Sequence, residues 1–86
     1  MVSLSMEVKQ LHKLNGEGKL RAFADVAISE LLLIRGLRVV EGKNGLFVGM
    51  PRQQGKNGQW YQIILPLNEE VKNQFEDLVL GAYQGQ

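Results

Sequence analysis

The chain has 86 residues, of which 44% are hydrophobic and 22% are charged, with a formal net charge of +1 at pH 7. This length predicts one domain, and so short a chain buries only about 60–65% of its unfolded surface, which favours self-association. The near-neutral charge excludes a bulk attraction to nucleic acid or anionic lipid, and the absence of cysteine excludes disulfides, thiolate metal sites and cysteine nucleophiles.

The N-terminal stretch carries no targeting signal. It lacks the basic region and the long apolar region of a signal peptide, and the longest apolar run, Leu31 to Ile34, is too short to cross a bilayer. The alternating pattern of a strand begins only at Met6. We therefore expect a cytoplasmic protein without membrane contact, with an N-terminal extension at residues 1–5 and a single domain at residues 6–86.

Two strands are predicted in the first third of the chain. The first runs from Met6 to Leu14, and its alternation slips after Val8, which is typical of a β-bulge or an edge strand. A turn at residues 15–18 leads to a second strand over Lys19 to Ser29. One face of this second strand is apolar: Leu20, Ala22, Ala24, Val26 and Ile28. The other face mixes polar and apolar side chains: Arg21, Phe23, Asp25, Ala27 and Ser29.

A long strand and a hairpin follow. After a brief interruption at Glu30, the third strand spans Leu31 to Glu41 with a bend expected at Gly36. A two-residue turn at Asn44-Gly45 would place Val39 opposite Met50, and Pro51 would end the next strand. One face of this hairpin then carries Leu37, Val39, Leu46, Val48 and Met50. The other carries Val40 and Phe47, which favours a hairpin covered on both sides.

The rest of the chain predicts a loop, a strand and a helix. Arg52 to Gln59 is interpreted as a mobile polar loop, and Trp60 to Leu65 as the last strand. Asn68 is a helix N-cap, with Glu69 and Glu70 suited to the positive end of the helix dipole. An apolar stripe follows at helical spacing: Val71, Phe75, Leu78, Val79 and Ala82. The fold class is therefore α+β, with a small antiparallel sheet of about five strands and a C-terminal helix.

Four segments of the chain stand out together: MEVKQL, GKLRAFADV, IRGLRVVEGKNGLFVGMP and the Pro66-Leu67-Asn68 start of the C-terminal helix. They resemble the SpoVG family of bacterial septation, or stage V sporulation G, proteins. The segment from Arg38 to Pro51 is the most specific, and NGLFV followed by MP is its sharpest signature. The resemblance extends from Met6 to about Tyr83. It implies a mainly β fold with a C-terminal helix, a homodimer, and a regulatory role in cell division and developmental gene expression.

The resemblance also implies DNA or RNA binding of low sequence specificity. Family members that bind nucleic acid tend to carry Arg and Lys at the start of the C-terminal helix. Here that segment reads NEEVKNQFED, with Lys72 as its only base. Arg52 and Lys56 preserve the basic loop that follows the Met-Pro step. A protein-interaction module of the same cellular network, without nucleic-acid binding, is the alternative that the acidic helix start favours.

The residue inventory gives no support to an enzyme. His12 is the only histidine, and a packed or solvated role on an edge strand is the better interpretation. The GKNG segments at residues 42–45 and 55–58 precede no helix, which favours turns over phosphate loops. We therefore expect no catalytic residue, no metal, no cofactor and no small-molecule substrate.

The remaining candidate is a cationic surface for phosphate contacts. Its predicted members are Arg21, Arg35, Arg38, Lys43, Arg52, Lys56 and Lys72. A scattered set of solvated charges is the alternative. Of Trp60 and Tyr61, one is expected in the core, while an exposed one could stack on an unpaired base. Dimerisation is expected through the strand edges at Met6 to Leu14 or Trp60 to Leu65, with the apolar helix stripe as another contact surface.

Overall fold

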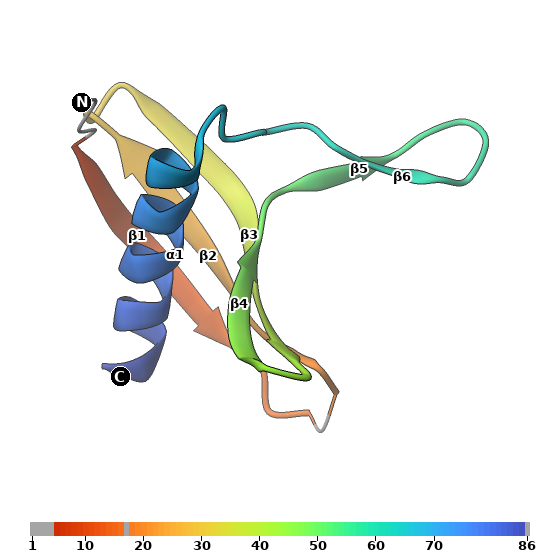
Figure 1. Ribbon diagram of the computed structural model, residues 1–86, viewed down its shortest axis with the longest axis horizontal. Coiled ribbons are helices and arrows are strands. Elements are labelled where there is room, and N and C mark those ends of the chain that lie inside the picture. Colours follow the sequence, from red (N-terminus) through yellow and green to blue (C-terminus); the bar gives the residue numbers. More distant parts are fainter. Residues whose placement is uncertain (1–4, 17, 86) are drawn as a thin grey trace.

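The computed structural model describes residues 5–16 and 18–85 as six strands and one helix (Figure 1). Glu17, within the predicted turn, and most of the predicted extension at residues 1–5 lie outside the described residues. The elements are β1 (Met6–Lys13), β2 (Leu20–Ile28), β3 (Leu32–Gly42), β4 (Gly45–Gly49), β5 (Arg52–Gln54), β6 (Trp60–Gln62) and α1 (Glu69–Gln84).

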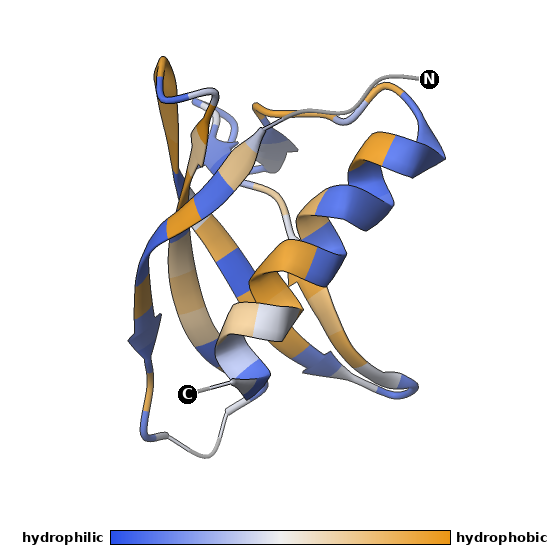
Figure 2. Cartoon of the chain, turned by 90° about the vertical axis from the view of Figure 1, so that its left-hand side faces the viewer, coloured by the Kyte–Doolittle hydropathy of each residue, from blue (hydrophilic) through white to orange (hydrophobic). Residues whose placement is uncertain are grey.

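β1 to β4 form one antiparallel sheet in the order β1-β2-β3-β4, so β1 and β4 are its edges. Helix α1 lies across one face of this sheet, as Figures 1 and 2 show. β5 and β6 pair only with each other, in a two-stranded ribbon that projects from the end of β4. The predicted α+β class is confirmed, but the last strand belongs to this separate ribbon and not to the main sheet.

The core lies between the helix and the covered face of the sheet. The residues that are buried there come from β2, β3, α1 and the end of β4: Ala22, Ala24, Val26, Leu37, Val39, Met50, Phe75 and Val79. The helix packs mainly on the edge strands β1 and β4, and the small residues Ala22 and Ala24 of β2 lie between these edges. The predicted apolar faces of the second strand and of the helix are both confirmed.

Two predicted irregularities are present in the strands. The pairing of β1 with β2 shifts between Val8 and Gln10, which places a bulge on the edge strand. The pairing of β2 with β3 shifts between Ala24 and Val26, opposite Gly36, whose φ is +86°. Glycine adopts this left-handed conformation without a steric penalty, so β3 bends at Gly36 as expected.

The predicted register of the β3–β4 hairpin is wrong by two residues. Val39 pairs with Val48, not with Met50, and Gly42 pairs with Gly45, so the turn residues are Lys43 and Asn44. Gly45 carries the positive φ, at +116°. Because side chains alternate with a period of two, a slip of two residues leaves each of them on its predicted face. The predicted face of each side chain is therefore correct although the predicted register is wrong.

The turn between β2 and β3 consists of Ser29 and Glu30, two residue types that seldom adopt a positive φ. Ser29 and Glu30 have φ values of 51° and 58°, and the Leu31 amide donates to the Ile28 carbonyl at 2.9 Å. Both residues are thus in the left-handed region, which costs non-glycine residues energy. The interruption predicted at Glu30 is therefore a full hairpin turn.

The predicted polar loop at Arg52 to Gln59 is instead part of the β5–β6 ribbon, which we call the arm. Side chains organise its tip: Asn57 accepts from the Gln59 amide at 3.0 Å, and Gln54 donates to the Gly58 carbonyl at 3.0 Å. At its base, the Ile63 amide donates to the Pro51 carbonyl at 3.1 Å. These bonds explain why a polar segment without an apolar pattern forms a hairpin.

The helix begins as predicted. The Asn68 side chain accepts from the Val71 amide at 2.9 Å, and Glu69 and Glu70 occupy the first turn. Within the described residues, no helix is long and apolar enough to cross a membrane. Because Phe75 and Val79 are buried against the chain's own sheet, the helix stripe is not available as the dimer contact that the sequence suggested.

Candidate nucleic-acid interface

The seven predicted cations do not form one cluster. Two of them have carboxylate partners. Arg21 contacts Glu41, with Nε at 3.1 Å and Nη2 at 2.5 Å from the same carboxylate oxygen. The Nε atom of Arg35 lies 3.9 Å from Asp25. The charges of these two arginines are therefore partly balanced by carboxylates.

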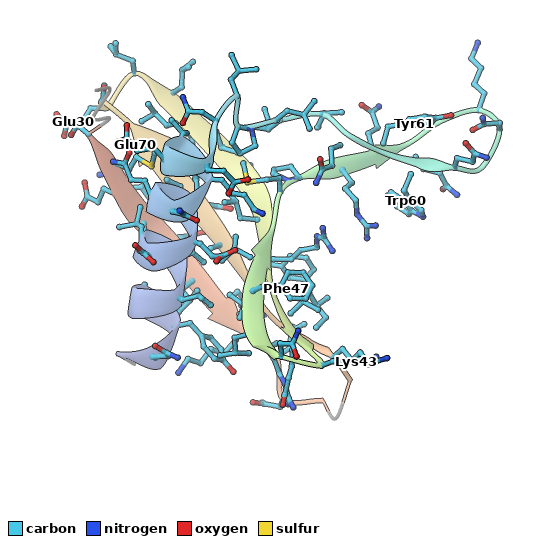
Figure 3. The ribbon with its side chains drawn as sticks, in the orientation of Figure 1. Glu30, Lys43, Phe47, Trp60, Tyr61 and Glu70 are labelled. Atoms are coloured by element: carbon cyan, nitrogen blue, oxygen red, sulfur yellow. The ribbon has the colours of Figure 1, made fainter. Side chains whose placement is uncertain are left out.

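Lys72 lies apart from the others. It is exposed on α1, which covers one face of the sheet, and it borders a cavity with Glu69 beside it. Figure 3 shows Glu70 on this same helix, away from the arm. The helix side therefore has an acidic character, and Lys72 does not join a cationic surface.

The remaining four cations, Arg38, Lys43, Arg52 and Lys56, come from β3, the β3–β4 turn and the arm. Within the described part of the chain, none of these four forms an ion pair with a carboxylate. Lys43 and Lys56 are exposed at the turns of the two hairpins. The cationic surface is thus smaller than predicted, and it belongs to the segment between residues 38 and 56.

Arg38 is held where the arm leaves the sheet. Its Nη2 donates to the Met50 carbonyl at 3.3 Å, and the guanidinium lies over Gly49. A Cβ atom on Gly49 would clash with Nη2, so a larger residue here would displace the Arg38 guanidinium. Nε of Arg38 is buried without a hydrogen-bond partner. Burial, and then the positive charge of Arg52, lower the pKa of Arg38.

Arg52 lies on β5 with its guanidinium 5.4 Å from the centroid of the Trp60 ring. A cation at this distance over an indole ring is attracted to it. The Met50 carbonyl that Arg38 contacts lies two residues before Arg52, and the charge of Arg52 contributes to the lowered pKa of Arg38. Two adjacent cations without an acidic partner form a site that an anion would stabilise.

Three aromatic rings lie around these two arginines. Phe23 pairs with Arg38 across β2 and β3, and Val40 pairs with Phe47 across β3 and β4, so both rings lie on the face that α1 leaves uncovered. Figure 3 shows Phe47 and Trp60 on the same side of β4, in the angle between the sheet and the arm. We call Phe23, Arg38, Phe47, Arg52 and Trp60 the cation–aromatic corner.

The exposure of these rings corrects two interpretations of the sequence. Phe23, Phe47 and Trp60 expose 39%, 43% and 57% of their surface, so the second face of the hairpin is not covered. Tyr61 is also exposed, and neither it nor Trp60 enters the core. Its hydroxyl accepts from Asn57 at 2.9 Å and donates to Gln59 at 3.2 Å, which makes it part of the arm tip.

The sequence contains a signal for this corner besides its cations. Phe23 stands among polar residues on the outward face of β2, and Phe47 is out of phase with the apolar face of β4. An aromatic residue at an outward position is worth examining as a contact residue. The face assignment identified both residues, but only the structure shows that no element of the described chain covers them.

The described residues offer little for metal or acid–base chemistry. They contain no group of three or more His, Asp or Glu side chains placed to hold a metal ion. His12 is exposed on β1, opposite Phe23. The arrangement is suited to contacts with charged and flat groups, since its members are guanidinium groups and aromatic rings.

Comparison with known proteins identifies relatives over nearly the whole chain. The sequence model of the SpoVG family matches residues 4–85. A protein of Archaeoglobus fulgidus named septation protein SpoVG is 36% identical over 77 residues, which are 90% of this chain and 91% of the relative. One from Symbiobacterium thermophilum is 38% identical over 86% of this chain but only 53% of its own length. One from Listeria monocytogenes is 32% identical over 87% and 74% of the two chains.

Proposed function

Since this chain belongs to the SpoVG family of septation proteins, we propose that it is a dimeric regulator of septation or sporulation-type development that binds DNA or RNA with low sequence specificity. The names of the relatives support the link to septation and give no enzymatic activity. Nucleic-acid binding is proposed from the charges of this chain's own residues.

One observation carries the proposal: Arg38 reaches the Met50 carbonyl, two residues before Arg52, and neither arginine forms an ion pair with a carboxylate of the described residues. A phosphate group between them would relieve their mutual repulsion and could pair with both guanidinium groups. Lys43 and Lys56, at the two hairpin turns, extend the positive surface to either side. Such contacts read the backbone and not the base sequence.

Binding should be measured by fluorescence anisotropy with labelled DNA and RNA 20-mers at about 50 mM and 200 mM salt. With about three phosphates neutralised, log K against log salt should have a slope of roughly −2 for a single strand. Arg52→Glu together with Lys56→Glu should weaken binding to every sequence. Lys72→Glu is the control for Arg52→Glu alone, because each makes one charge reversal and Lys72 lies on the helix side. Equal weakening by Arg52→Glu and Lys72→Glu, or no binding at micromolar protein, would contradict the proposal.

The homodimer is proposed from exposed area. The chain exposes 6270 Å², whereas a compact monomer of its 9.7 kDa mass would expose about 5,100 Å². The excess, about 1,100 Å², is larger than the roughly 800 Å² that each partner buries in a standard interface. Aliphatic residues are the best candidates for contact, and the large exposed ones are Leu31, Leu32, Leu33, Ile63, Leu65 and Leu67.

A groove of about 360 Å³ lies beside these residues, between the segment that leads into α1 and the end of the sheet. Leu65 and Leu67 line it together with Ile28 and Ile34. We propose that a second copy covers this region. Light scattering should give twice the monomer mass, and Leu65→Asp with Leu67→Asp should give a folded monomer. A wild-type monomer at tens of micromolar would contradict the dimer without affecting the nucleic-acid measurement.

A protein-interaction module without nucleic-acid binding is the second candidate. The acidic first turn of α1, with Glu69 and Glu70, favours it. A stoichiometric partner that survives nuclease treatment and is lost on Glu69→Lys with Glu70→Lys would support this reading. An unchanged partner complex after the charge reversal would count against it.

A further inference from the structure

We propose that the cation–aromatic corner binds single-stranded nucleic acid by stacking unpaired bases on Phe23, Phe47 and Trp60 while Arg38 and Arg52 contact the phosphates. This inference rests on the proposed function and specifies its ligand. A strand whose bases are free, and not a duplex, would be the preferred form.

The three rings are placed for such contacts. Phe23 and Phe47 project from β2 and β4 on the same uncovered face of the sheet, with β3 between them. Two strand spacings separate them by about 10 Å across the sheet. Trp60 extends the series onto the arm, where it shares one face of the ribbon with Arg52 and Gln62. Rings from two hairpins thus face the same exposed angle.

Aromatic side chains on an open sheet are the means by which several modules hold unpaired bases. A base inside a duplex is stacked on its neighbours and cannot lie on a protein ring unless it is extruded. The fixed rings of Phe23 and Phe47 project from regular strands and offer no wedge that would open a duplex. The corner therefore selects strands that are already unpaired.

Charge supports the same ligand. The corner contains two guanidinium groups and no carboxylate. Asp25, two residues from Phe23 on the same face of β2, lies 3.9 Å from Nε of Arg35, while Glu30 and Glu70 lie on the other side of the molecule, as Figure 3 shows. Within the described residues, the Arg38 guanidinium makes one hydrogen bond, from Nη2 to the Met50 carbonyl, so it retains other N–H groups that could donate to a phosphate oxygen.

The cation–aromatic corner and the region proposed for the dimer contact differ in the type of side chain that they expose. The exposed contact residues of the corner are aromatic and beside arginines, while the exposed residues around the groove at Leu65 and Leu67 are aliphatic. Aliphatic side chains gain from burial against any apolar surface, but only a ring gains from stacking. A substitution that keeps apolar area and removes the ring can therefore distinguish the two kinds of contact.

Trp60 is the only tryptophan in the chain, so its fluorescence reports on the corner directly. Titration of the dimeric protein with an unlabelled oligothymidine or oligouridine 12-mer should quench the emission as a base stacks on the indole. The matching duplex should quench it far less at the same phosphate concentration. Polyphosphate serves as a control that supplies phosphates without bases, and it should bind without quenching.

The decisive variants replace rings by leucine. Phe23→Leu and Phe47→Leu should each weaken binding of the 12-mer by roughly 5- to 150-fold, which is the range for one lost base–aromatic stack. Phe47→Tyr retains the ring and should bind like the wild type. Asn73→Ala, at an exposed position of α1 outside both the corner and the proposed dimer contact, is the control for general surface changes. Unfolding curves of all variants should coincide to within about 1 kcal/mol.

The outcomes separate this inference from the proposed function. Equal affinity for strand and duplex, with unchanged binding after Phe→Leu replacement, would overturn stacking and leave phosphate binding intact. Absence of any binding would overturn both. A third outcome would assign the corner to a contact with a second copy of the chain and would also overturn the inference. In that case Phe23→Ala and Phe47→Ala would convert the dimer to a monomer, while neither Phe→Leu change would affect nucleic-acid binding.

Discussion

The two faces of the four-stranded sheet differ in what covers them. On one face, small and branched residues such as Ala24, Val26 and Val39 meet α1 and form the core. On the other, Phe23 and Phe47 stay partly exposed beside Arg38, and no element of the described chain lies over them. The comparison shows that stability comes mainly from one face, which leaves the other free to carry contact residues.

Truncating one residue on each face distinguishes core residues from contact residues by the loss in the free energy of unfolding. Leu37→Ala removes a fully buried side chain and should lower the free energy of unfolding by about 2–5 kcal/mol. Phe23→Ala removes a larger side chain from the uncovered face and should cost less than about 1 kcal/mol. Urea unfolding of both variants measures the difference. Similar losses would mean that the uncovered face is part of the core.

The cap of α1 tests how firmly the helix covers its face. Asn68→Ala removes the acceptor of the Val71 amide and should cost about 1 kcal/mol of the unfolding free energy. Asn68→Asp keeps an acceptor and should be close to the wild type. Thermal unfolding followed by circular dichroism compares the three proteins, and an Asn68→Asp loss as large as that of alanine would argue against the capping role.

Gly49 tests how Arg38 is held on the uncovered face. Gly49→Ala would push the guanidinium away from the Met50 carbonyl, and the lost hydrogen bond should cost about 1 kcal/mol. In an Arg38→Ala background the same change should cost almost nothing, because no side chain remains to be displaced. A double-mutant cycle by urea unfolding measures this coupling, and additive losses would show that Gly49 has another role.

The turn that joins β2 to β3 gives the smallest expected effect. Glu30→Gly removes left-handed strain and should raise the free energy of unfolding by roughly 0.5–1 kcal/mol, since part of the gain is offset by the freedom of glycine in the unfolded chain. Glu30→Gln leaves the backbone strained and should be neutral. The same urea assay applies, and a destabilised glycine variant would refute the strain interpretation.

The sequence predicted best what depends on side-chain alternation. The faces of β2, the bend at Gly36 and the N-cap at Asn68 follow from local patterns, and the faces of β3 and β4 survived a wrong register because the error was two residues. The arm was missed because polar side chains at its tip form its turn. The Ser29–Glu30 turn was missed because neither residue is one that usually adopts positive φ.

The cationic site was less predictable because charge balance depends on neighbours across strands. Arg21 and Arg38 look alike in the sequence, yet Glu41 reaches Arg21 from another strand, while Arg38 meets the Met50 carbonyl. No local pattern indicates which strand will supply a carboxylate. The same limit applies to Trp60, whose place on a projecting ribbon depends on the pairing of β5 with β6.

The bond between the Ile63 amide and the Pro51 carbonyl closes the base of the arm, so the chain leaves and re-enters the main body at one point. Residues inserted or deleted beyond that point would not change the distance that the body must span. The arm is thus a segment whose length can vary among related proteins without any adjustment of the sheet or the helix. Its reach could be altered by natural variation, or by an engineer, while the rest of the molecule keeps its shape.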